Sequence, residues 1–319
     1  MYQKPTSKTM HMNFKNAKNG FVLSIVLWIV AALMLVALLV ALFSKDTLTL
    51  SNGIEQKMVA RLEAHSLLEQ LKFYIATSNY DNISLLNDQF SDLGVVFPSQ
   101  IILDGRWYQL SKHKRFKIQD SSGVFNLLSL DPLILARYVT DDRALQSAIA
   151  DSILDWVDSD DEVRLNGAEA PFYKIQKGVN YRPSNLYCLQ HPKELELINA
   201  LDTLSPELLQ TLQEHTHFAN PSALNVMLLD AKMLASTLQI PLSHAQTLTQ
   251  LRDESLLSFL KELQTISTFS IEMMSLAISR QFIIEIEVEH KNAKALLKTT
   301  IDFRPTEHLF YTVISEQNY

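Results

Sequence analysis

The fold of this chain is decided by residues 18–43, whose sequence is KNGFVLSIVLWIVAALMLVALLVALF. Residues 21–43 contain no charged side chain. At about 1.5 Å of rise per residue, a helix of this length spans roughly 35 Å, which is enough to cross a bilayer. Because backbone polar groups in hydrocarbon must be satisfied within the segment, we predict a transmembrane helix at 21–43.

The residues before the apolar run set its orientation. Residues 1–20 carry four lysines and no acid. A basic flank stays on the cytoplasmic side, so we predict a single pass through the inner membrane with the bulk of the chain exported. A plain signal anchor or an uncleaved signal peptide would share this pattern. The run is longer than a secretory signal, however, and residues 40–44 are a poor signal-peptidase site.

The junction Lys18-Asn19-Gly20-Phe21 is more specific, because a glycine separates the basic segment from a helix that begins with Phe. This junction resembles the site cut by prepilin peptidase. The resemblance implies that residues 1–20 are a leader and that Gly20 and Phe21 flank the cleaved bond. The apolar helix would then stay on the mature protein. Met1 and Met12 both remain open as the first residue.

The fifth position of such a mature chain is Ile25. Pilins and pseudopilins usually carry a Glu there. A carboxylate in a membrane helix is costly, so its presence or absence is informative. In the pilin family this Glu pairs with the N-terminus of a neighbouring subunit. The resemblance therefore implies that a subunit without it has no subunit ahead of it and lies at a tip.

Helical spacing continues beyond the membrane segment. Apolar residues recur mostly at steps of about three or four, with charged residues between them, at Ile54, Met58, Leu62, Leu67, Leu68, Leu71 and Ile75. We predict one long helix over 21–75 whose second half packs one apolar stripe on a folded domain, as the spine of a pilin does. Two helices broken near Ser51-Asn52-Gly53 are the alternative.

Strands are predicted on both sides of a helical stretch. Residues 100–103 and 107–110 flank Asp104-Gly105, a turn signal, so we expect a hairpin there, followed by a strand at 115–119. Three strands are predicted near the C-terminus. Their ranges are 268–279, 281–289 and 295–303. In the second of these, Ile284, Ile286 and Val288 alternate with glutamates, which predicts one buried face and one wet face.

The stretch between the two groups of strands has a helical pattern. Asp131-Pro132 and Ser205-Pro206 each place a capping residue before a proline at the first helical position. Further helices are predicted at 142–157 and 255–263, from apolar residues at helical spacing. The whole pattern predicts an α/β domain interrupted by an all-α domain.

Several motifs resemble those of the K-type minor pseudopilins of the type II secretion system (general secretion pathway protein K). The most specific is the run 155–173, which resembles the family's D-W-x-D-x-D…G-A-E…Y segment. Other similar stretches are 120–127, 181–185, 194–212 and 223–226. The last of these departs from the family's I-N-V-N pattern, because Met227 stands where a second Asn is usual.

The resemblance implies an α+β architecture. This is a pilin-like fold, a long N-terminal helix plus an antiparallel sheet, interrupted by an all-α, SAM-like insert. We therefore expect a leader at 1–20 and the transmembrane part of the spine helix at 21–43. The first part of the pilin-like domain is expected at 44–125, the all-α insert at 126–266 and the C-terminal strands at 267–319.

The resemblance also implies a function. A protein of this family would be a minor pseudopilin at the tip of the type II secretion pseudopilus, initiating or capping assembly for protein export across the outer membrane. Its globular part would lie in the periplasm and contact the I-type and J-type minor pseudopilins, and the family implies methylation. The alternative is a tip subunit of a related type IV pilus or competence filament, with an adhesive or DNA-contacting role.

A cluster of acids lies inside the most specific motif. Its members are Asp155, Asp158, Asp160, Asp161 and Glu162, and Glu169 follows. Calcium takes roughly six to eight hard oxygen ligands, often from a tight loop. The spacing is not that of an EF-hand, because the glycine of that loop is missing, and a solvated acidic loop is the alternative. K-type pseudopilins bind calcium in this helical domain, so the resemblance favours calcium with these six residues as candidate ligands, Asp155 ahead of Asp161.

Other chemistries have no motif behind them. The sequence has no G-x-S-x-G, no Gly-rich phosphate loop and no Cys–His pair, so an enzyme is not predicted. His215 and His217 are expected to be a solvent-facing pair, and the single cysteine, Cys188, a packed hydrophobe. Nucleic acid is not an expected partner, because the net charge is −7 and residues 179–319 lack glycine for a phosphate-binding hairpin.

Overall fold

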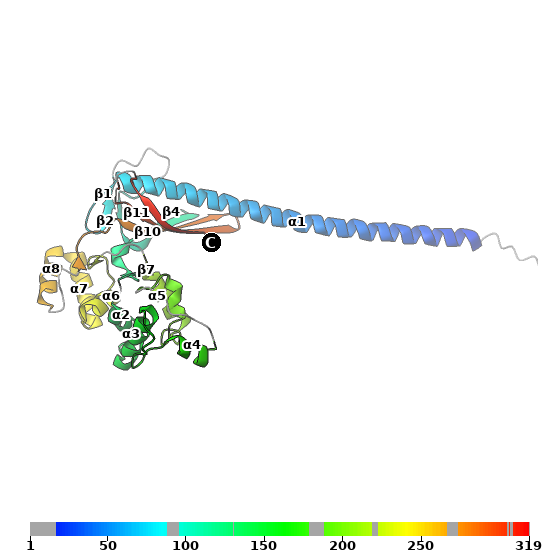
Figure 1. Ribbon diagram of the computed structural model, residues 1–319. Helices are drawn as coiled ribbons and strands as arrows, with labels where there is room; N and C mark the ends of the chain where they lie inside the picture. The colour runs from blue at the N-terminus through cyan, green and yellow to red at the C-terminus, as the bar shows by residue number, and fades with distance from the viewer. Residues whose placement is uncertain are drawn as a thin grey trace, which may run out of the picture. The chain divides into compact units, whose positions relative to one another are not determined.

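The computed structural model describes residues 17–87, 96–129, 131–178, 188–218, 223–266, 274–304, 306 and 309–318, without the side chains of 17–20 and 46. Helix α1 spans Ala17–Thr77 as 61 residues without a break (Figure 1). The prediction of one long helix is therefore confirmed, and the alternative break near Gly53 is wrong. A glycine inside a helix costs only about 1 kcal/mol relative to Ala, which is too little to interrupt a helix of this length.

Two compact units divide the chain. One ends at Val59 and also includes residues 291–293, and the other begins at Ala60. The apolar side chains of residues 21–43 are exposed in the first unit. Among the described residues, α1 is the helix that is long and apolar enough to cross a membrane. Its length and composition therefore suit the predicted membrane anchor.

The predicted apolar stripe of α1 is in fact two faces. Leu67, Leu71 and Ile75 are buried, but Ile54, Met58 and Leu62 are more than half exposed, so the prediction of a single packed stripe is wrong for its first three members. At about 100° per residue, those three lie roughly 130° around the helix from the buried group. Residues at steps of four drift around a helix, so an apolar repeat of this length does not stay on one face.

A five-stranded sheet receives the buried face of α1. Its strand order is β12-β11-β10-β5-β4, and the β4–β5, β5–β10 and β11–β12 pairs are antiparallel. The strands are β4 (Asp104–Ser111), β5 (Lys114–Asp120), β10 (Gln281–His290), β11 (Ala293–Asp302) and β12 (Thr312–Asn318). Leu67 and Leu71 of α1 share one apolar core with Phe116 and Ile284 of the sheet. This is the α+β, pilin-like arrangement that was predicted.

The alternation predicted for the strand at 281–289 is confirmed in β10. Ile284, Ile286 and Val288 are fully buried, while Glu285 and Glu287 lie on the other face. Lys117 and Lys298, from the two neighbouring strands, contact Glu285 at 3.0 and 2.9 Å. Opposite charges on directly paired strands stabilise the sheet modestly, so the second face is held by cross-strand ion pairs.

The hairpin predicted around Asp104-Gly105 is wrong. Residues 100–102 form β3, which pairs with β2 (Ser84–Leu86) in a separate three-stranded sheet with β1 (Asn79–Tyr80). The turn of the β4–β5 hairpin lies instead at Lys112 and His113. Gly105 has φ = +80° next to a register shift between Asp104 and Trp107. The glycine therefore serves a bulge rather than a turn, and both uses need the same positive φ.

Several strands were not predicted. Among them are β1, β2 and β12, and β12 is an edge strand with five polar residues among its seven. Polar residues on an edge strand reduce aggregation, but they also remove the alternation of apolar and polar residues by which a strand is predicted from sequence. Of the strand predicted at 268–279, residues 268–273 lie outside the described residues. Only β9 (Met274–Ser275) is seen in the rest, paired with β8 (Leu224–Asn225).

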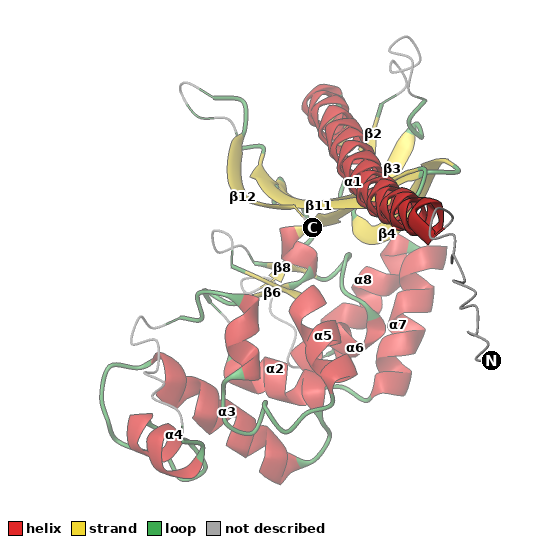
Figure 2. Cartoon of the chain, turned by 90° about the vertical axis from the view of Figure 1, so that its right-hand side faces the viewer, coloured by secondary structure: helices red, strands yellow, loops and turns green. Residues whose placement is uncertain are grey.

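The region between β5 and β10 is mostly helical, as predicted (Figure 2). Asp131, Asp142, Ser205 and Ser255 cap helices with their side chains, at four of the predicted helix starts. The helices are α2 (Pro132–Val139), α3 (Arg143–Val157), α4 (Ala170–Gln176), α5 (Pro206–Glu214), α6 (Ala231–Leu238), α7 (Leu242–Glu254) and α8 (Leu256–Thr265), with 3-10 turns η2 (Ser121–Gly123) and η3 (Pro192–Glu196).

Two short parallel pairings depart from a purely helical insert. They join β6 (Phe125–Asn126) to β7 (Thr216–His217), and β8 to β9. The chain leaves and rejoins the sheet at one joint, where the buried carboxylate of Asp120 accepts hydrogen bonds from the backbone N–H groups of Ser122 and Ser279 at 2.8 and 3.0 Å. Asp120 therefore ties the outgoing strand to the returning one.

The packed face of α1 can be tested by truncation. Leu71→Ala should lower the free energy of unfolding by about 2–5 kcal/mol, because it opens a cavity in a core where Leu71 is fully buried. Leu62→Ala, on the same helix but 64% exposed, should change it by less than about 0.5 kcal/mol. Urea unfolding of the purified, detergent-solubilised protein, followed by circular dichroism, measures both. Equal losses for the two variants would contradict the packing described here.

Candidate metal centre

The acidic cluster begins in the last turn of α3, and packing fixes that turn. Trp156 is 3% exposed and packs edge-on against Tyr173, with ring centroids 5.4 Å apart. Its indole N–H donates a hydrogen bond to Oε2 of Glu194 at 3.0 Å. Because Trp156 faces the helical core, its neighbour Asp155 is held in one orientation at the end of α3. The aromatic residue in the motif thus positions the carboxylate beside it.

Three of the six predicted ligands come together. Asp155, at the end of α3, Asp158, at its C-cap, and Glu169, the residue before α4, each place a carboxylate oxygen within 4.8 Å of the other two. Asp155 is fully buried and Glu169 is 2% exposed. The loop between α3 and α4 therefore folds back so that its two ends meet.

The remaining three predicted ligands lie apart from this group. Asp160, Asp161 and Glu162 are exposed on the loop. Oδ1 of Asp160 accepts a hydrogen bond from the backbone N–H of Glu162 at 2.9 Å, which stabilises the turn of the loop. Asp161 still acts on the centre through its charge, because it is one of the groups that raise the pKa of Glu169.

An arginine lies among the three carboxylates. Nη1 of Arg164 donates to Oδ1 of Asp155 at 2.5 Å and also contacts Oδ2 of Asp158. The backbone N–H of Arg164 donates to Oδ2 of Asp155 at 3.1 Å. These two carboxylates in turn raise the pKa of the guanidinium, which is charged throughout the physiological range. Arg164 is thus the cation that balances Asp155 and Asp158 in this structure.

Glu169 is the carboxylate that the arginine does not reach. Burial, together with the charges of Asp155, Asp158 and Asp161, raises its pKa to about 7. Its Oε1, like Oδ1 of Asp158, is buried and has no hydrogen-bond partner among the described residues. A buried carboxylate oxygen without a donor is costly, so these atoms indicate a site that would accept a further cation.

Gly167 allows the loop to close. A Cβ atom on this residue would lie 1.9 Å from Oδ2 of Asp155, inside any possible contact distance. Sequence reasoning did not identify the roles of Gly167 and Arg164. The sequence did contain a sign of both roles. The loop is rich in acids, and a single arginine and a single glycine within such a loop each need a structural reason.

The donor set suits a hard divalent cation. Calcium binds carboxylate oxygens at about 2.3–2.6 Å, so oxygens that share an ion lie at most about 5 Å apart, as these three do. Three carboxylates, two of them with an unused buried oxygen, are oxygen donors of the kind that calcium prefers. The residues present therefore fit the predicted ion.

The structure also describes the predicted processing junction and the single cysteine. Gly20 and Phe21 both lie within α1, and the side chain of Phe21 is 69% exposed. The motif at 181–185 lies outside the described residues. Cys188 is half-buried.

The prediction that His215 and His217 form a solvent-facing pair is wrong. His217 is 5% exposed because it belongs to β7, which pairs with β6 inside the domain. Burial lowers its pKa to about 4. His215 is half-buried, and its ring lies 3.3 Å from the carboxylate of Asp230, a hydrogen bond that raises the pKa of the histidine.

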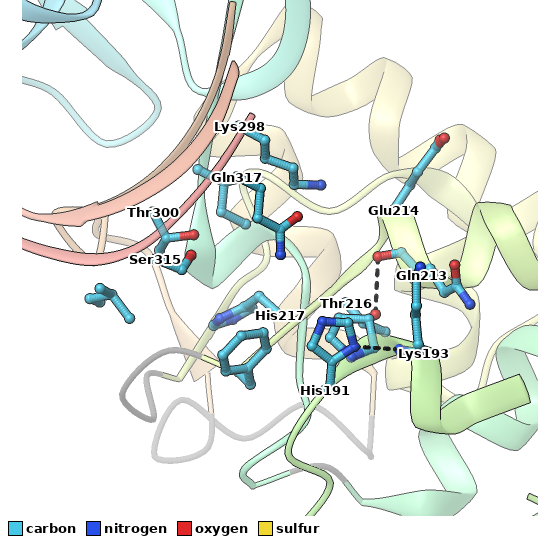
Figure 3. Close-up of a pocket in the computed structure, with 14 residues that line it drawn as sticks. His191, Lys193, Gln213, Glu214, Thr216, His217, Lys298, Thr300, Ser315 and Gln317 are labelled. Atoms are coloured by element: carbon cyan, nitrogen blue, oxygen red, sulfur yellow. Dashed lines mark hydrogen bonds between the residues drawn. The ribbon is translucent and has the colours of Figure 1, made fainter. Parts of the chain in front are cut away.

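His217 also lines a cavity of about 190 Å³ between η3, β7 and the outer face of the sheet. Figure 3 shows His191 and His217 on one side of this cavity and Thr300 and Ser315 on the other. Lys193 and Glu214 also contribute to its lining. Its lining mixes apolar side chains, such as Phe218, Ile283 and Ile314, with polar and charged ones. Among these described residues no pair matches a known catalytic arrangement.

The fold and the helical insert define a class, a pilin-like protein whose sheet is interrupted by a mostly helical domain. Residues 126–217 match the family model for type II secretion system (T2SS), protein K. The predicted resemblance to the K family is confirmed over this part of the insert.

The whole fold also has a solved counterpart. It is similar to a chain in the crystal structure of the GspK–GspI–GspJ complex from the enterotoxigenic Escherichia coli type 2 secretion system, with a TM-score of 0.53. The match covers 86% of this chain and 99% of that chain at 17% identity. At that identity the likeness shows the fold. None of the curated protein sequences matches the chain.

The raised pKa of Glu169 predicts a pH dependence of the metal-free protein. Because its pKa is near 4.5 in the unfolded chain and about 7 in the folded one, the folded state binds more protons between these values. The free energy of unfolding should therefore fall as the pH rises from about 4.5 to about 7. Glu169→Gln should remove that dependence. Thermal unfolding in a chelating buffer across this pH range measures it, and an unchanged pH profile in the variant would contradict the assignment.

Proposed function

We propose that this chain is a minor pseudopilin of the type II secretion machinery, anchored by α1 in the inner membrane with its folded domain in the periplasm. One observation carries the proposal: a helical region that matches the protein K family is inserted between β5 and β10 of a pilin-like sheet. The basic N-terminal flank supports the orientation. The role is structural, because the chemistry of the described sites consists of packing, ion pairs and a candidate ion site.

The position within the pseudopilus is proposed to be the tip. Ile25 occupies the fifth position after the Gly20–Phe21 junction, where an acid would pair with a subunit ahead. An uncharged residue there removes the need for such a neighbour and the cost of a carboxylate in the membrane. The subunit would thus initiate or cap assembly. The large helical insert suits this position, since a subunit at the end of a filament has room above it.

The partners are proposed to be the I-type and J-type minor pseudopilins. The solved chain with this fold was crystallised in a complex with two such proteins, GspI and GspJ. A similar fold that covers nearly all of that chain supports a similar assembly here.

Calcium is proposed as the ion of the acidic cluster, held by Asp155, Asp158 and Glu169. Its charge would offset the three carboxylates, and its coordination would use Oε1 of Glu169 and Oδ1 of Asp158, which have no hydrogen-bond donor. A divalent ion at this point would cross-link the end of α3 to the start of α4 and so stabilise the insert. The ion would have a structural role.

Processing and assembly test the main proposal. When the full chain is co-expressed with prepilin peptidase and the I-type and J-type pseudopilins of its own secretion system, the mature protein should begin at Phe21 and purify with both partners. Intact-mass spectrometry identifies the first residue, and size-exclusion chromatography in detergent detects the complex. Retention of Gly20 or elution without either partner would count against the pseudopilin role. A shift of labelled DNA at low salt would favour the filament alternative.

Calorimetry tests the ion. Titration of calcium into the chelator-treated, detergent-solubilised protein should show binding that Asp158→Asn weakens by at least about tenfold, since it removes one of the three converging carboxylates. Asp160→Asn is the matched control, with the same change in charge on the exposed part of the same loop. It should alter the affinity by no more than about twofold. Similar losses in the two variants would show that the cluster attracts calcium only through its general charge.

A further inference from the structure

The guanidinium of Arg164 lies where the charges of the acidic cluster converge. Nη1 contacts one oxygen of Asp155 and one of Asp158, and both residues belong to the group whose oxygens lie within 4.8 Å of one another. These contacts are charge-assisted hydrogen bonds, which are among the strongest that side chains form. The position that a bound cation would share between these two carboxylates is therefore held by a cation that belongs to the protein.

Arg164 balances only part of the negative charge at this centre. A guanidinium carries one positive charge, and the centre contains three carboxylates. Hydrogen bonds from Arg164 reach Asp155 and Asp158, while Oε1 of Glu169 has no donor among the described residues. A divalent ion would supply twice the charge and could contact all three groups at once. The arginine thus satisfies the site in part, and calcium would satisfy it more fully.

The two cations exclude each other. Calcium needs carboxylate oxygens at about 2.3–2.6 Å, and Nη1 already contacts one oxygen of Asp155 and one of Asp158, two of the three carboxylates that would share the ion. A guanidinium so close to a calcium ion would also be repelled by its charge. Arg164 has a way out, because its side chain is 37% exposed and lies on the loop between α3 and α4.

We propose that Arg164 is a built-in substitute for the metal, which holds the calcium-free loop closed and is displaced into solvent when calcium binds. The inference rests on the proposed calcium site. The backbone N–H of Arg164 can keep its bond to Asp155, so the exchange moves a side chain and leaves the path of the loop in place. Calcium affinity is then set by a competition within the protein, and the insert stays folded when calcium is scarce.

Removing the competitor should tighten calcium binding. Arg164→Gln should raise the calcium affinity by about tenfold, which is about 1.4 kcal/mol, and should lower the melting temperature of the calcium-free protein by about 3 °C. Saturating calcium should bring the melting temperatures of the variant and the wild type back together. Calorimetry with calcium chloride and thermal unfolding, both on the detergent-solubilised full chain, give these values.

Arg143→Gln is the matched control. Arg143 is an exposed arginine at the start of α3, roughly 18 Å along the helix from Asp155, so it reports the effect of losing one positive charge. It should change the affinity by no more than about twofold. Equal affinities for wild type and Arg164→Gln would overturn the competition while leaving the calcium site intact. Weaker binding by Arg164→Gln would also overturn it, and no binding by either protein would overturn both this inference and the site.

A measurement on the wild-type chain covers the case in which the variant does not fold. Phenylglyoxal modifies accessible guanidinium groups, and peptide mass spectrometry can follow Arg164 and Arg143 in the same sample. Calcium should speed the modification of Arg164 several-fold and leave that of Arg143 unchanged. If calcium binds and the rate at Arg164 does not rise, the side chain has not been released and the proposal fails.

Discussion

The apolar face of α1 between residues 60 and 75 packs on the sheet, and the rest of the domain is arranged around that contact. Over residues 21–43 the helix is apolar on all sides, as suits a segment surrounded by lipid. Between residues 60 and 75 one face is covered, and the sheet covers it with residues such as Phe116 and Ile284. Each fully buried large apolar side chain contributes about 1.5–3 kcal/mol. That contact commits one face of the sheet to α1 and leaves the other face for ion pairs and the cavity.

The insert can be large because it enters at a single joint. β5 and β10 are neighbours in the sheet, with Asp120 opposite Phe282, so the insert is in effect a long loop of one antiparallel pair. The entropy of closing a loop rises only slowly with its length, and a folded loop has its own core. Asp120 secures the joint by accepting hydrogen bonds from both sides. Burial raises the pKa of this carboxyl, and the hydrogen bonds act in the opposite direction. Burying the carboxylate therefore costs free energy, which these specific hydrogen bonds offset in part.

Sequence patterns predicted the parts of this fold that depend on local chemistry. Caps such as Ser205 and the alternation of β10 act within a few residues, so they can be recognised without knowing the fold. The failures depend on distant partners. Gly105 has the positive φ of a turn, but its strand continues because β5 pairs along it. β12 has no apolar alternation, and His217 is buried only because β6 lies beside it.

The acidic loop shows the same limit in the candidate site. The run of acids left a calcium site and a solvated loop both open, and the resemblance to the K family favoured calcium. The sequence placed Asp155 ahead of Asp161 as a ligand, but it could not separate Asp158 from Asp160, which differ in exposure and not in type. It also could not show that Arg164 turns inward while its exposed neighbours Val163 and Leu165 do not. Three carboxylates that meet beside a buried tryptophan require a positive charge, and the protein carries one of its own at that point. The loop can therefore form before any ion arrives, and an ion that binds there must replace an interaction that already exists.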